Sequence, residues 1–287
     1  MAKRAALPSL KPDQVVELGD ELLANADRLL NAALQVIEGG NLGLARSLAI
    51  LGLEESGKAI ALHQRRRDMA FEEEGSPFVD ANLQKLWADH HSKLALAYDF
   101  LVAEEYWFGT EPSDPEVNRV WLGEVKAWTR RHNVLKQRGF YVDVGSSGEI
   151  FTPEAAADER SLREVIGHVH QIGWQLRLGE HIVATRQEES VRAVPPATEE
   201  DIDRTRQTFS RFEWMAASEI ERVCDEMRAG KPAGALNNEA YRIRLPGPGV
   251  NPFANMGRPG YEAETRELLK FADEIGLNGD EPSGSGE

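Results

Sequence analysis

The residues NLGLARSLAILGLEESGKAIALHQRRR, at positions 41–67, indicate the kind of fold most directly. Ala, Leu, Glu and Arg dominate them, and alternating β-branched residues are scarce, which is typical of a helix. Gly39-Gly40, just before this stretch, is a stop signal for an earlier helix over 13–38. Because short connections between long amphipathic helices favour antiparallel neighbours, we expect an antiparallel helical bundle.

Helical composition continues along most of the chain. Further helices are expected over 81–107, 115–138, 153–189, 198–228 and 261–275. Residues 139–152, GFYVDVGSSGEIFT, are the one strand-like stretch and predict a small hairpin or an extended loop. We therefore expect an all-α fold with a bundle over 13–190, a helical C-terminal extension over 195–277 and a disordered tail over 278–287.

Composition limits the function classes. The 287 residues carry 48 acidic against 33 basic side chains, a net charge of −15, which argues against broad DNA binding but permits a local basic site. The single cysteine, Cys224, excludes an internal disulfide framework and fits a reducing, cytoplasmic setting. No apolar run reaches the roughly 18 residues of a membrane helix, and no secretory signal is recognised, so no membrane association is expected.

Charged residues share the leucine-bearing face of the helix over 41–67. With about 100° per residue and Leu51 at zero, Glu55 falls at about +40°, Lys58 at about −20° and Glu54 at about −60°. Buried charges are retained only when they are paired. These residues are interpreted as an ion-pair network that fixes helix register, as a functional polar pocket, or as plain surface with Glu54 and Lys58 as an i,i+4 pair.

The expected helix over 81–107 repeats this pattern. His90 falls at about −20° from Leu83, inside an apolar stripe, and Lys93 lies one turn on at its edge. A lone histidine on an apolar face is commonly a satisfied core residue, but one that meets a Glu-rich helix can join a site. The expected polar core cluster consists of Glu54, Glu55, Lys58, His90 and Lys93.

Residues 126–138, KAWTRRHNVLKQR, reverse the sign of the chain, with five basic residues and no acidic one. Cations near a helix C-terminus are favoured by the macrodipole, which is the structural explanation. The functional explanation is an RNA or phosphate site, with Trp128 and Tyr141 available for base stacking. The candidate RNA- or phosphate-binding residues are Arg130, Arg131, Lys136, Arg138 and Tyr141.

The helix over 153–189 contains an arginine and two histidines in SLREVIGHVHQ. Arg163 and His170 lie about 20° apart on the wheel, whereas His168 is rotated by roughly 140° from Arg163. Imidazole can move a proton of a 2′-hydroxyl, and guanidinium can hold a phosphate, so the pair suits metal-independent phosphodiester chemistry. The sequence has no Glu-x-x-His, Walker A or dinucleotide-binding motif, so neither a metal nor a cofactor is predicted.

Three motifs together suggest a family. ARSLAILGLEESGKA (45–59), then His90-x-x-Lys93-Leu94, then LKQRGFYVDVGSSGEIFTP (135–153) resemble the AbiV abortive-infection family over roughly residues 20–190. This family is grouped with HEPN-like helical domains, so the resemblance implies phage defence, ribonuclease activity and a homodimer. HEPN ribonucleases show Arg, four to six residues, then His. Arg163 with His168 or His170 fits that spacing, although Glu164 replaces the usual polar residue after the arginine.

Three functional hypotheses follow. The first is a cytoplasmic phage-defence effector that cleaves RNA, with Arg163, His170 and His168 as the catalytic candidates. The second is a non-catalytic effector that binds a phage or host protein and blocks translation or replication. The third is a small-molecule enzyme that uses a closed pocket of Glu55, Lys58 and His90.

Overall fold

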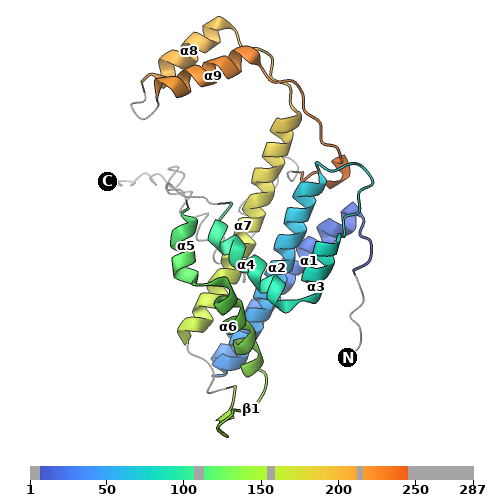
Figure 1. Ribbon diagram of the computed structural model, residues 1–287, viewed down its shortest axis with the longest axis vertical. Coiled ribbons are helices and arrows are strands. Elements are labelled where there is room, and N and C mark those ends of the chain that lie inside the picture. Colours follow the sequence, from blue (N-terminus) through green and yellow to red (C-terminus); the bar gives the residue numbers. More distant parts are fainter. Residues whose placement is uncertain (1–6, 107–112, 154–158, 212–215, 245–287) are drawn as a thin grey trace, which may run out of the picture.

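The computed structural model describes residues 7–106, 113–153, 159–211 and 216–244 (Figure 1). In these residues the expected all-α fold is confirmed, with nine α-helices, one two-stranded hairpin and a short 3₁₀ turn at Glu239–Tyr241. The helices are α1 (Pro12–Glu38), α2 (Leu42–Met69), α3 (Ala81–Ala88), α4 (His90–Ala103), α5 (Pro115–Leu122), α6 (Val125–Arg138), α7 (Glu159–Val191), α8 (Glu199–Phe209) and α9 (Ala217–Ala229). No helix in the described ranges is long and apolar enough to cross a membrane.

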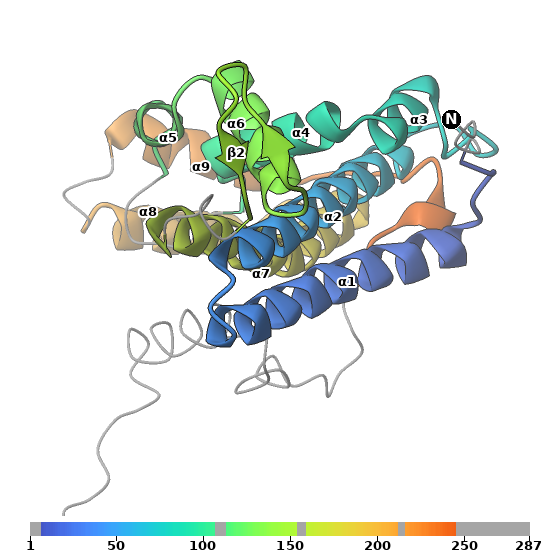
Figure 2. The same cartoon turned by 90° about the horizontal axis from the view of Figure 1, so that it is seen from below.

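A tight turn joins the two long N-terminal helices. Gly40 adopts φ +82°, a left-handed conformation that glycine takes without strain. Asn41 then caps α2, because its side-chain oxygen accepts a hydrogen bond of 3.0 Å from the Leu44 amide. The turn returns the chain on itself, so α1 and α2 pack side by side along their lengths (Figure 2).

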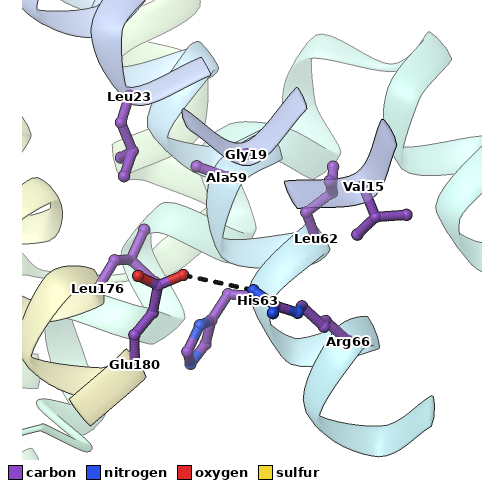
Figure 3. A pocket seen from close by; sticks show the side chains of 9 residues that line it. All are labelled: Val15, Gly19, Leu23, Ala59, Leu62, His63, Arg66, Leu176 and Glu180. Carbon is purple, nitrogen blue, oxygen red and sulfur yellow. Dashed lines mark ion pairs between the residues drawn. The ribbon is translucent and has the colours of Figure 1, made fainter. Parts of the chain in front are cut away.

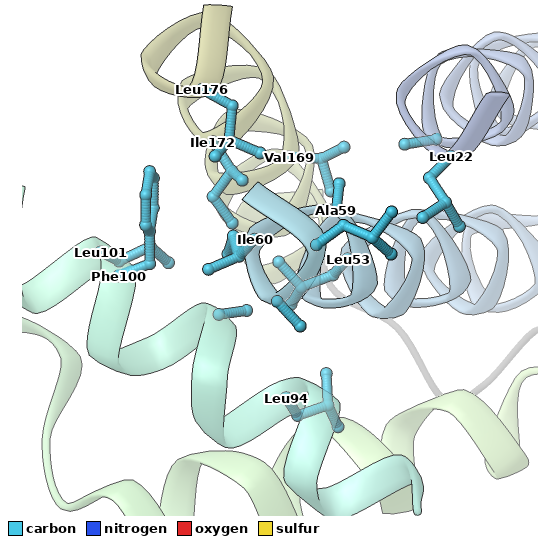
Figure 4. Close-up of a cluster of buried hydrophobic side chains, with 14 of the residues drawn as sticks. Leu22, Leu53, Ala59, Ile60, Leu94, Phe100, Leu101, Val169, Ile172 and Leu176 are labelled. Carbon is cyan, nitrogen blue, oxygen red and sulfur yellow. The ribbon is translucent and has the colours of Figure 1, made fainter. Parts of the chain in front are cut away.

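Helix α2 is the centre of the bundle. It packs against α1, α4, α6 and α7, and more than half of its 28 residues are buried. Figure 4 shows apolar side chains of α1, α4 and α7 meeting those of α2 around Leu53, Ala59 and Ile60. Because neighbours surround it, α2 has small residues where other parts of the chain approach it closely. A Cβ on Gly43, for example, would overlap the carbonyl oxygen of Pro153, which follows β2 (Ile150–Phe151).

Two of the expected long helices are each divided, which corrects the prediction. The expected helix over 81–107 breaks at Asp89, whose extended backbone ends α3 and whose carboxylate accepts from the His91 and Ser92 amides to start α4. The expected helix over 115–138 breaks at Gly123, which has φ +80°. The hydroxyl of Tyr98 donates to the Gly123 carbonyl at 2.5 Å and holds this break against α4.

The strand-like stretch forms a hairpin. Strands β1 (Asp143–Val144) and β2 (Ile150–Phe151) pair antiparallel, with Asp143 opposite Phe151 and Val144 opposite Ile150. The hairpin follows α6 at the end of the bundle where α2 begins (Figure 1). Its apolar residues Val142, Val144 and Ile150 are each at least 64% exposed.

The C-terminal extension begins as a helical pair. The expected helix over 198–228 is wrong as one element, because α8 ends at Phe209 and α9 starts at Ala217. The pair has its own small core of Ile202, Ile220 and Cys224, and lies beyond the end of α7 in Figure 1. The expected helix over 261–275 and the tail over 278–287 lie outside the described residues.

Candidate acid–base site

A buried carboxylate joins three helices. Glu54 on α2 has a side chain that is only 4% exposed, and each of its oxygens has a partner. The Oε1 atom accepts from the Nζ of Lys136 on α6. The Oε2 atom lies 2.6 Å from Nδ1 of His90 on α4. The carboxylate therefore connects α4 and α6 through α2.

This arrangement sets the tautomer of His90. A carboxylate that accepts from Lys136 can only accept from the imidazole as well, so the proton in the short contact is on Nδ1. Lys136 Nζ, which is 3.5 Å from that same nitrogen, is then a neighbouring positive charge and not its donor. In the neutral imidazole the lone pair is then on Nε2, and the His90 side chain is 42% exposed. A buried carboxylate thus orients a histidine whose ring reaches solvent, as in acid–base dyads.

Close packing brings Lys136 to Glu54. The Ser47 hydroxyl on α2 lies 2.8 Å from the Lys136 carbonyl and 3.1 Å from the Gly43 carbonyl. A Cβ on Gly139 would lie 2.0 Å from Ser47 Oγ, so only glycine permits this crossing of α6 and α2. The last turn of α6 is thereby fixed on α2.

A second polar pair lies beside the first. Lys58 Nζ is 2.6 Å from Glu55 Oε1, and both side chains are 18% exposed. The same ammonium lies 5.4 Å from the centre of the Trp87 ring, within cation–π distance. Lys93 is buried at 2% exposure. The expected polar core cluster is therefore divided in the structure. Glu54 and His90 are in contact and are joined by Lys136, whereas Glu55 and Lys58 pair beside Trp87.

The arginine and histidines expected on α7 do not join this site. Arg163 is 77% exposed and pairs with Glu159 one turn earlier on the same helix. Val169, the neighbour of His170, contacts α2 at Gly52, which is about 160° around α2 from Glu54. His170 comes two residues after His168, which puts it about 160° around α7 from the side that faces Trp128 on α6. His168 faces α6, with its ring centre 6.1 Å from that of Trp128.

A buried histidine on α6 was not singled out from the sequence. His132 is 1% exposed, lies with its ring centre 4.0 Å from that of Trp128 and donates from Nδ1 to the Trp128 carbonyl at 2.8 Å. Burial, the largest influence, lowers its pKa to about 4. Burial also lowers the pKa of the half-buried His168. Within the described residues, His168 Nδ1 and Trp128 Nε1 are buried without a hydrogen-bond partner.

The candidate RNA-binding residues divide by exposure. Arg130, Arg131, Arg138 and Tyr141 are exposed, and Arg131 pairs with Glu164 at 3.3 Å. Arg138 lies 4.7 Å from the centre of the Phe151 ring. The prediction that Lys136 binds RNA or phosphate is corrected, because this side chain is buried against Glu54 and cannot reach a ligand on the surface.

Trp128 is corrected in the same way. It is 2% exposed and so cannot stack on a base, although Tyr141 can.

A cavity of about 40 Å³ lies elsewhere, between α1, α2 and α7 (Figure 3). Its polar residues are His63, Arg66 and Glu180, the last two being 3.7 Å apart as an ion pair. Glu55, Lys58 and His90 do not line it, so it gives no support to the small-molecule hypothesis. The described ranges contain no group of three or more His, Cys, Asp or Glu side chains able to hold a metal ion.

The all-α bundle is consistent with a HEPN-like fold. The sequence profile of a HEPN family described as AbiV matches residues 14–174, more than half of the chain. The chain belongs to the AbiV family, and this membership supports a role in abortive-infection defence. No curated protein and no solved structure matches the chain.

Proposed function

We propose that this protein acts in the cytoplasm as an abortive-infection effector that cleaves RNA without a metal ion, and that His90 is its acid–base group. The supporting observation is the contact of 2.6 Å between His90 Nδ1 and a carboxylate that is almost fully buried. Lys136 pairs with the other oxygen of Glu54, so the carboxylate that orients His90 is held in place from both sides.

The chemistry is an internal transfer within RNA. His90 Nε2 takes the proton of a 2′-hydroxyl, whose oxygen then bonds to the adjacent phosphorus while the bond from phosphorus to the 5′-oxygen breaks. The 5′-oxygen leaves with a proton supplied by a water molecule, and the proton held by His90 passes to solvent afterwards, so the products are a 2′,3′-cyclic phosphate and a 5′-hydroxyl. A positioned general base contributes about 10²- to 10⁴-fold to such a step. We further propose a homodimer, as the family resemblance implies.

Incubation of the purified chain with total RNA in EDTA tests this function. Cleavage with cyclic phosphate ends is expected, and the His90→Gln variant should lose it while keeping the parent's unfolding temperature. Intact RNA after incubation with correctly folded parent protein, purified from phage-infected cells, would exclude the ribonuclease proposal.

A second function is favoured by one observation. Val142, Val144 and Ile150 expose apolar surface on the hairpin, which suits contact with a protein. The alternative is therefore a non-catalytic effector that binds a phage or host protein and blocks translation or replication. In that case His90→Gln would protect cells from phage as well as the parent does, whereas Val144→Lys would not.

A further inference from the structure

Exposed aromatic residues flank α6. Trp121, near the end of α5, is 82% exposed, and Tyr141, just after α6, is 68% exposed. Val120 beside Trp121 is 84% exposed. Large aromatic side chains in water are unusual unless they meet a partner, because they carry much apolar area and little polar surface.

Basic residues lie between the two rings. Lys126 and Arg130 are exposed on α6, and neither has an ion-pair partner among the residues described. Arg138 follows at the Tyr141 end of the helix. No acidic residue occurs within α6, and Glu124, its N-cap, is the nearest acid at the Trp121 end. A local positive surface in a chain of net charge −15 favours a polyanion.

The spacing suits an extended strand. The 14 residues of α6 rise by about 21 Å in total, and α5, α6 and the hairpin follow one another along one side of the molecule (Figure 1). Several nucleotides of extended strand cover such a length. The inner side of α6 carries Lys136, whose contact with Glu54 places His90 beside this helix.

We infer that α6 binds a single-stranded segment of RNA, with phosphates along Lys126 and Arg130 and bases stacked on Trp121 and Tyr141. This inference rests on the proposed function for the choice of RNA. A single strand is required because bases in a duplex already stack on one another and present no open ring face. The aromatic pair then selects unpaired segments and holds them on the helix that also contacts Glu54 through Lys136.

Fluorescence anisotropy tests binding apart from cleavage. The protein is the full chain with His90→Gln, and the probes are an unstructured labelled RNA of about 12 nucleotides and the blunt duplex of the same sequence. Trp121→Ala and Tyr141→Ala should each raise the Kd for the single strand between about fivefold and about a hundredfold. Trp121→Phe and Tyr141→Phe, which keep a ring, should stay close to the parent. Phe71→Ala, which removes a 51% exposed aromatic at the end of α2, is the matched control.

Salt dependence tests the basic residues. The slope of log K against log salt should fall by about 0.7 for each of Lys126→Gln and Arg130→Gln. Equal binding of strand and duplex, or unchanged Kd in both alanine variants, overturns the inference and leaves the two rings to a protein partner. If the parent cleaves RNA but both alanine variants keep the parent's Kd for the single strand, this inference is rejected and the proposed function is not. If the alanine variants bind the single strand more weakly but the parent does not cleave RNA, the proposed function is rejected and this inference is not.

Discussion

The carbonyl oxygen of Lys93 lies against Gly57, so that a Cβ on this glycine would be only 2.4 Å from it. The obstructing atom belongs to the backbone of α4 and cannot rotate away. This contact sets the distance between α2 and α4, three residues beyond the Glu54 and His90 side chains that form the site. Gly57 is therefore a spacer that permits the contact of Glu54 with His90.

Gly57→Ala should destabilise the fold by about 2 kcal/mol, because overpacking typically costs about 1–3 kcal/mol. It should also reduce activity, since α4 must move away from Glu54. Urea unfolding measures the first effect. Gly173→Ala on α7 is the control, because open space surrounds this position and alanine favours a helix by about 0.5–1 kcal/mol. Equal stability of the Gly57→Ala variant and the parent would contradict the assigned packing.

Breaking one side of the Glu54–Lys136 pair should cost more than removing both. Lys136→Met leaves a buried carboxylate with less compensation, and such losses are about 3–5 kcal/mol. Adding Glu54→Gln should restore much of that stability but no activity. A double-mutant cycle by urea unfolding gives the coupling energy. Additive losses would mean that the two groups do not interact.

Stability should decrease below neutral pH. Burial lowers the pKa of His63 and of His132 from 6.5 to about 4, with nearby Arg67 and Arg66 adding to the effect at His63. Between these values the unfolded chain binds more protons than the folded one. The stabilisation is therefore complete above about pH 6.5 and lost as the pH falls toward about 4, by roughly 3 kcal/mol for each histidine.

Urea unfolding at a series of pH values across this range checks the prediction. His63→Gln combined with His132→Gln should flatten the pH dependence relative to the parent. A parent protein with equal stability at about pH 7 and about pH 5 would exclude the lowered pKa values.

The two candidate catalytic regions can be separated by activity. His90→Gln should reduce RNA cleavage by at least about 100-fold. The Arg163→Ala, His170→Ala double variant should keep most of it, because Arg163 pairs with Glu159 at the surface and His170 lies about 160° around α7 from His168, which faces α6. Initial rates and thermal unfolding are measured for each variant. If the double variant loses cleavage and His90→Gln keeps it, the catalytic site is on α7.

The sequence predicted the all-α class, the turn at Gly39-Gly40 and, over 139–152, a hairpin or an extended loop, of which the hairpin forms, because periodicity and turn residues are local signals. The breaks at Asp89 and Gly123 were missed because helical composition continues across both positions. Asp89 before His-His-Ser was a usable signal, since aspartate is a common N-cap.

The site was predicted in part. Glu54 and His90 were expected in one polar cluster from their places on apolar stripes, and they are in contact. Lys136 was assigned to a phosphate-binding surface, because its own helix contains no acidic partner and Glu54 lies on another helix. That partner depends on how Gly139 and Ser47 let α6 cross α2, and no local pattern reports such a crossing.

Packing on all sides of α2 also affects how variants of this helix are interpreted. Gly43 and Gly57, both buried on this helix, leave no room for a larger side chain, because a Cβ there would meet backbone oxygens. Substitutions at its buried positions are expected to lower protein abundance in cells before they reveal anything about chemistry. Loss of phage protection in a variant of this helix is therefore informative only when the amount of folded protein has been measured alongside it.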